Sequence, residues 1–118
     1  MNQDAIVVLI LSIALAVLMT STGVAGRNGT LPLNSFLGIR TNMTRKSEEA
    51  WNAAHLAASP FNFLAAGCFA ITGLVAAFVV DGKQAASTAV IIGWGAGMIA
   101  TGAAVFVARR AAVTALGG

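Results

Sequence analysis

The sequence predicts an all-α integral membrane protein, a single domain over residues 1–118 that forms a three-helix bundle with a short interfacial helix in its first connection. Composition gives the first reason. Hydrophobic residues make up 58% of the chain and charged residues only 9%, whereas about a quarter of the residues in a soluble domain are charged. The second reason is distribution, because the apolar residues gather in three runs, each near the roughly 20 residues that cross a bilayer.

The three predicted spans cover about residues 5–25, 60–80 and 85–108. Up to residue 19, the only polar residue of the first span is Ser12. The polar sequence Asp-Gly-Lys at 81–83 separates the second and third spans. It is short enough to form a tight turn, so we expect these two spans to pair as a hairpin.

The first apolar run has an alternative interpretation as a cleaved signal peptide. Signal peptides begin with basic residues and have an apolar stretch of about 7–15 residues. This chain begins with Met-Asn-Gln-Asp, without a basic residue, and its apolar run lies at the upper limit of that length. We therefore expect the first run to be retained as a span.

The positions of Lys and Arg predict the orientation in the membrane. With three spans, the N-terminus lies on the same side as the 81–84 turn, which carries one basic residue, Lys83. The 26–59 connection and the C-terminus share the other side. That side carries six basic residues: Arg27, Arg40, Arg45, Lys46, Arg109 and Arg110. Because basic residues accumulate in cytoplasmic loops, we expect a multipass membrane protein with its N-terminus outside and its C-terminus cytoplasmic.

Small residues recur every four positions within two of the predicted spans. The two rows are Ser12, Ala16 and Thr20 in the first span, and Gly93, Gly97 and Thr101 in the third. Such rows let helix backbones approach closely in a membrane. They are what a compact bundle or a homo-oligomer needs. We expect Trp94, which lies well inside the third span, to pack against other helices or a partner chain.

The cytoplasmic segment 26–59 holds four of the seven basic residues and the only His. Thr44 or Ser47 can cap a helix whose first turn contains Glu48 and Glu49. In that helix Glu48, Trp51, Asn52 and His55 occupy positions i, i+3, i+4 and i+7, so the spacing predicts that they share one face.

Two interpretations of this face stay open. In the structural one, Trp51 anchors an interfacial helix, His55 bonds a neighbour, and the carboxylates are solvated or pair with Arg45. In the functional one, the side chains of Arg40, Glu48, Trp51, Asn52 and His55 form a polar site at the mouth of the bundle. One His and two carboxylates fall short of the three protein ligands of a catalytic zinc site, so we expect no metal and no cofactor.

Other functional classes have little support in the sequence. It contains no Walker loop, CxxC or HExxH motif. No charged residue lies in the middle of a span, although ion and proton pathways usually need one. No basic stripe is interleaved with aromatic residues, so we expect no nucleic-acid partner. Cys68 lies in an apolar run, where a small hydrophobic role is expected.

The stretch 34–55 resembles the signature of the SdpI family of small bacterial multipass membrane proteins. The residues that match it are Asn34, Gly38, Ile39, Arg40, Thr41, Thr44, Ser47, Glu48, Glu49, Trp51 and His55. One span before this stretch and two after it also fit the family. The resemblance implies a membrane bundle whose cytoplasmic motif binds a partner or supports the fold.

The resemblance also implies a class of function. The best-known member of the family protects its producer against a secreted membrane-active peptide toxin, and it holds a cytoplasmic repressor at the membrane. We therefore expect a non-enzymatic immunity or signalling protein of the bacterial inner (cell) membrane. Its expected partners are the lipid bilayer, an apolar peptide toxin and a cytoplasmic regulator. The expected binding residues are Asn34, Gly38, Arg40, Thr41, Ser47, Glu48, Glu49, Trp51, Asn52 and His55.

Three alternatives stay open. The chain could be an accessory subunit that docks against other membrane subunits. It could be a small oligomeric transporter or channel, or a membrane enzyme that uses Glu48 and His55.

Overall fold

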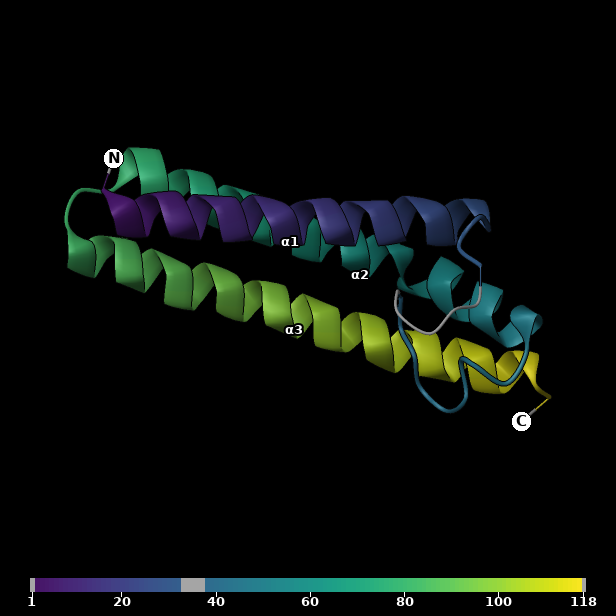
Figure 1. Cartoon of the computed structure of the whole chain (residues 1–118). Coiled ribbons are helices and arrows are strands. Elements are labelled where there is room, and N and C mark those ends of the chain that lie inside the picture. Colours follow the sequence, from purple (N-terminus) through teal and green to yellow (C-terminus); the bar gives the residue numbers. More distant parts are fainter. Residues whose placement is uncertain (1, 33–37, 118) are drawn as a thin grey trace.

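The computed structural model describes residues 2–32 and 38–117, and within them it confirms an all-helical three-helix bundle (Figure 1). The elements are α1 (Gln3–Asn28), α2 (Glu48–Leu74), the short π-helix η1 (Val75–Val79) that continues α2, and α3 (Lys83–Ala115). All three α-helices are long and apolar enough to cross a membrane. The chain is therefore a multipass membrane protein.

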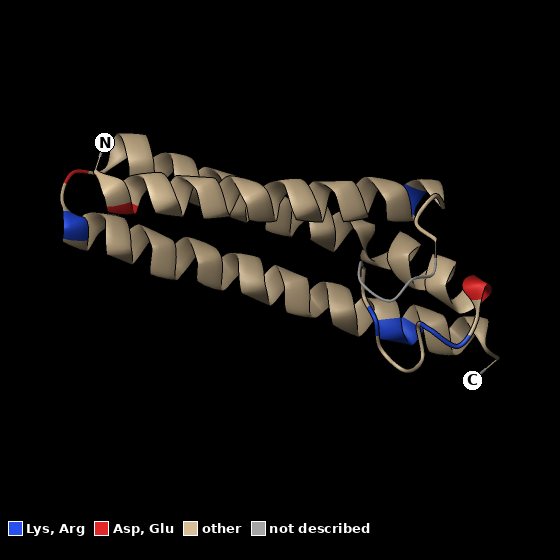
Figure 2. Cartoon of the chain, viewed as in Figure 1, with Lys and Arg blue, Asp and Glu red and all other residues tan. Residues whose placement is uncertain are grey.

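The bundle is an elongated body of 53 × 21 × 19 Å in which α2 packs along both α1 and α3. Charged residues gather at its two ends (Figure 2). On α1, no charge lies between Asp4 and Arg27, a stretch of about 35 Å at the helical rise of 1.5 Å per residue. This stretch matches the hydrocarbon core of a bilayer, which is about 30 Å thick.

Most of the buried apolar residues in the described part of the chain are alanines. One cluster consists of buried alanines that pack α2 against α3, namely Ala50, Ala54, Ala58, Ala104, Ala108 and Ala112. Large apolar side chains such as Ile91 and Ile99 instead face outward and are 73% and 76% exposed. Lipid is as apolar as a protein core, so membrane helices gain from close backbone approach rather than from burying large side chains. Ser12 and Ala16 follow this pattern, whereas Thr20 is exposed.

Helix α2 passes through Pro60 without a break. The interfacial helix and the second span, predicted as separate segments, are therefore one continuous helix. Proline has no N–H to donate to the carbonyl four residues earlier, which here belongs to Leu56. The Ser59 hydroxyl donates to that carbonyl instead, at 2.9 Å. A neighbouring hydroxyl is one way in which membrane helices tolerate an internal proline.

The bundle has two distinct ends. At the hairpin end, the start of α1 lies beside the turn between η1 and α3, where Gly82 has a positive φ of 91°. The motif end, opposite, carries the C-terminus of α3 and the loop that leads into α2 (Figure 1).

Candidate functional site

His55 lies at the centre of the motif end, where it is only 1% exposed. The backbone N–H of Ile39 donates to its Nε2 at 2.8 Å, and its Nδ1 lies 2.8 Å from the carbonyl oxygen of Trp51. Because Nε2 accepts a hydrogen bond, the proton is assigned to Nδ1, which donates to Trp51. The neutral imidazole thus ties the loop to α2 through Nε2, while the bond from Nδ1 to the preceding turn of α2 fixes the orientation of the ring.

Trp51 fixes the loop at a second point. Its indole Nε1–H donates to the carbonyl oxygen of Leu31 at 2.9 Å, and its ring centroid lies 4.2 Å from that of His55. Leu31 precedes residues 33–37 and Ile39 follows them, so the two neighbouring rings hold the chain on both sides of that stretch. The predicted site residue Asn34 lies outside the described residues.

Because Gly38 has no side chain, the His55 ring can occupy the space beside its backbone. Its φ is +95°, and a Cβ at this position would lie 2.5 Å from Nε2 of His55 and 3.1 Å from the ring of Trp51. Gly26 on α1 makes a similar approach, because a Cβ there would lie 2.7 Å from the His55 carbonyl oxygen. Both contacts explain why these positions suit glycine and no larger residue.

Thr41, Thr44 and Ser47 complete the loop structure. The hydroxyl of Thr44, which is fully buried, donates to the Ile39 carbonyl at 2.8 Å and accepts the Thr41 N–H at 2.9 Å. Ser47 caps α2 by accepting the N–H of Ala50 at 3.0 Å, which confirms one of the two predicted helix starts. We call this set the loop-fixing residues: Gly38, Thr41, Thr44, Ser47, Trp51 and His55.

The four residues of the predicted polar face of α2 differ in burial. Trp51 and His55 point into the bundle, whereas Glu48 and Asn52 are exposed. The side of the helix that packs against α1 and α3 is rotated toward Ala54 and Ala58, so it covers two of the four residues and leaves the other two exposed. The second set, the exposed motif residues, comprises Arg40, Glu48, Glu49 and Asn52.

A metal centre finds no support in the described part of the chain, where no three His, Cys, Asp or Glu side chains gather to hold an ion.

Sequence reasoning did not assign a role to Leu31, whose carbonyl is the acceptor for Trp51. A backbone acceptor carries no signal in the sequence. Thr44 did carry one, as a predicted helix cap, but its role is to hold the loop.

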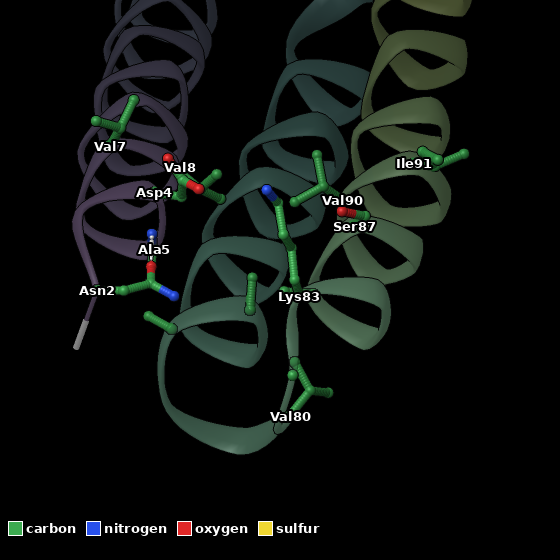
Figure 3. Close-up of a pocket in the computed structure, with 14 residues that line it drawn as sticks. Asn2, Asp4, Ala5, Val7, Val8, Val80, Lys83, Ser87, Val90 and Ile91 are labelled. Carbon is green, nitrogen blue, oxygen red and sulfur yellow. Dashed lines mark hydrogen bonds between the residues drawn. The ribbon is translucent and has the colours of Figure 1, made fainter.

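A cavity of about 730 Å³ lies at the hairpin end, between the first turns of α1, η1 and the start of α3 (Figure 3). Its walls are mainly apolar and include Val8, Ala77 and Val90. Asp4 on α1 and Lys83 on α3 extend their side chains into this space from opposite sides (Figure 3). The cavity therefore combines an apolar interior with one charge of each sign.

The comparisons with known proteins give one match. Neither a search of the curated proteins nor a search of the solved structures found a similar chain. A family model does match residues 30–108, which is more than half of the chain and includes the loop-fixing residues. The chain therefore belongs to the SdpI/YfhL protein family.

Proposed function

We propose that the chain is a non-enzymatic protein of the bacterial inner membrane that protects against an apolar, membrane-active peptide and signals this encounter to a cytoplasmic regulator. The main support for the proposal is that the motif residues fall into two sets, one buried or bonded within the loop and one exposed. The loop-fixing residues hold the loop on α2, and the exposed motif residues beside them remain available to a partner. Polar groups on a loop held by a rigid scaffold are typical of binding sites.

The cavity at the hairpin end is the proposed peptide site. The predicted orientation puts this end on the outer side of the membrane, where a secreted peptide arrives. The apolar walls suit hydrophobic side chains, and Asp4 and Lys83 suit the polar groups of a peptide that enters the membrane interface. The exposed motif residues would then face the cytoplasm and contact the regulator.

A growth assay tests the protection. Cells that express the chain are compared with empty-vector cells across a panel of purified, secreted membrane-active peptides, and the chain should raise the inhibitory concentration of at least one. Ala77→Trp, which fills the cavity, should abolish that protection at normal protein levels. Ala96→Trp is the matched control, because Ala96 is exposed on α3 and does not line the cavity.

A transcript profile tests the signalling. The protective peptide should induce a defined set of genes in the native host, and Glu49→Lys should lose this induction while protection stays unchanged. If substitutions at all four exposed motif residues keep both responses, the motif is purely structural and the signalling half of the proposal fails.

Gentle detergent extraction followed by mass spectrometry tests the accessory-subunit alternative. Stoichiometric co-purification with one larger membrane protein, together with no protection against any peptide, would replace the proposal. Recovery of the chain alone, or as a homo-oligomer, agrees with it.

A further inference from the structure

A second cavity, of about 370 Å³, lies at the motif end directly under the loop. Residues 38–41 cover it, α1 contributes Leu18 and Thr22, α3 contributes Thr101 and Val105, and α2 contributes Asn62. All three helices and part of the family motif thus line the cavity, which is open on one side.

Asn62 places an unused hydrogen-bond donor at this cavity. The residue is 2% exposed, and its side-chain nitrogen is buried without a hydrogen-bond partner. A buried amide that lacks a partner is costly, and nearly all buried polar groups have one. The primary amide has two N–H groups, so this position calls for an acceptor oxygen.

The other polar groups of the cavity do not supply that oxygen well. The hydroxyls of Thr22 and Thr101 donate to the carbonyls of Leu18 and Gly97 within their own helices, at 2.9 Å each. These bonds direct the hydroxyls along the helices. The Thr41 hydroxyl bonds Thr44 within the loop. Apart from these residues and Arg40, the lining is apolar or glycine, with Leu18 and Val105 43% and 38% exposed on the surface of the bundle. An apolar ligand can therefore enter from the lipid along these two side chains.

The basic residues at this end of the bundle indicate the charge of the ligand. Arg40 lines the cavity and is exposed, and Figure 2 shows the other basic residues of this end on the loop, α1 and α3. The ligand should therefore combine an acceptor oxygen, an apolar body and a negative charge. Free phosphate has the charge but leaves the apolar walls uncovered.

We propose that this cavity binds an anionic diacyl phospholipid, with an ester carbonyl accepting from the Asn62 amide, the phosphate beside Arg40 and an acyl chain along Leu18 and Val105. The two polar contacts have separate effects. Asn62 recognises a group that every diacyl phospholipid carries, whereas Arg40 distinguishes anionic from zwitterionic lipids. This site is independent of the peptide cavity at the opposite end.

The amount of lipid that stays bound measures the contact with Asn62. The full chain is reconstituted in nanodiscs of phosphatidylglycerol and phosphatidylcholine, extracted in mild detergent, and analysed by native mass spectrometry. One phospholipid should remain bound per chain, enriched in phosphatidylglycerol. Asn62→Leu should reduce the retention of both lipids about fivefold, the equivalent of one hydrogen bond. Asn28→Leu, an exposed asparagine at the same end that does not line the cavity, should retain lipid like the parent.

Arg40→Gln separates charge recognition from the carbonyl contact. It should remove the preference for phosphatidylglycerol but keep the retention of phosphatidylcholine. Equal retention by the parent and by Asn62→Leu would overturn the proposal. So would a fully delipidated parent, because a water molecule would then be the partner of Asn62. Displacement of the bound lipid by inorganic phosphate would also contradict it, because a free anion would then be the ligand.

Discussion

At the scale of single residues, two glycines with positive φ allow two effects on stability to be measured separately. One is the packing of the loop against α2, and the other is backbone strain. Gly29 and Gly38 have φ values of 69° and 95°. A Cβ at Gly29 meets nothing within 4 Å, whereas one at Gly38 meets the His55 ring. Alanine should suffer backbone strain at both positions, but a steric conflict only at Gly38.

Gly38→Ala should therefore lower the free energy of unfolding by about 2–4 kcal/mol, the sum of left-handed strain and overpacking. Gly29→Ala should lower it by only about 1 kcal/mol. Unfolding in mixed micelles, followed by circular dichroism during an SDS titration, measures both. Equal losses would mean that the loop does not pack on His55 as described.

Trp94 and Ser12 make a polar contact within the hydrophobic part of the bundle. The indole Nε1–H of Trp94 on α3 donates to the hydroxyl of Ser12 on α1 at 2.9 Å, and Ser12 is fully buried. A double-mutant cycle of Ser12→Ala and Trp94→Phe should give a coupling energy of about 0.6 kcal/mol, typical of hydrogen bonds between membrane helices. The same SDS titration supplies the four free energies, and additive effects would show that the bond contributes nothing.

At the scale of helices, the sequence predicted where α2 begins, but it did not predict that α2 continues unbroken into the second span. Ser47 was recognisable as a cap because it precedes Glu48, Glu49 and an alanine-rich run. The predicted second span began at about residue 60, but α2 passes through Pro60 although proline usually interrupts a helix. The contact that allows α2 to continue is the Ser59 hydroxyl bond to Leu56, which depends on a rotamer and has no clear sequence signal.

The Ser59 contact can be tested by restoring the missing backbone donor. Ser59→Ala should destabilise the chain by about 1 kcal/mol, because it leaves the Leu56 carbonyl without that partner. In a Pro60→Ala background, the new backbone N–H at position 60 can donate to Leu56 instead. Ser59→Ala should then have almost no effect on the free energy of unfolding. An undiminished loss in that background would show that the Ser59 hydroxyl does not substitute for the missing donor.

The two sets of motif residues show a second feature that the sequence alone could not predict, namely which residues of the predicted face are buried. Helical spacing correctly relates Trp51 to His55, four residues later, and both are buried. The same spacing also admits Glu48 and Asn52, which are exposed. Spacing defines which residues are neighbours on a helix, but the position of α1 and α3 around α2 decides which of them are covered. Asn62 illustrates the same point, because only packing makes its amide an unpartnered group.

At the scale of the whole molecule, both cavities arise from the same arrangement. Helix α2 packs along both α1 and α3, and each cavity is lined by residues of α1 and α3 as well as of the α2–η1 helix. These two cavities lie at opposite ends, and the charges differ between those ends (Figure 2). The orientation of the bundle therefore decides which cavity meets secreted molecules and which meets the cytoplasmic leaflet.

Thiol labelling measures this orientation. Cys68 is the only cysteine, so a Cys68→Ala background allows single thiols to be placed at exposed positions of the two ends. Gln84→Cys reports on the hairpin end and Asn42→Cys on the motif end. In intact spheroplasts a membrane-impermeant maleimide should label Gln84→Cys, whereas Asn42→Cys should react only after permeabilisation. The reverse pattern would place the six basic residues outside, against the strong cytoplasmic preference of Lys and Arg, and would exchange the roles proposed for the two cavities.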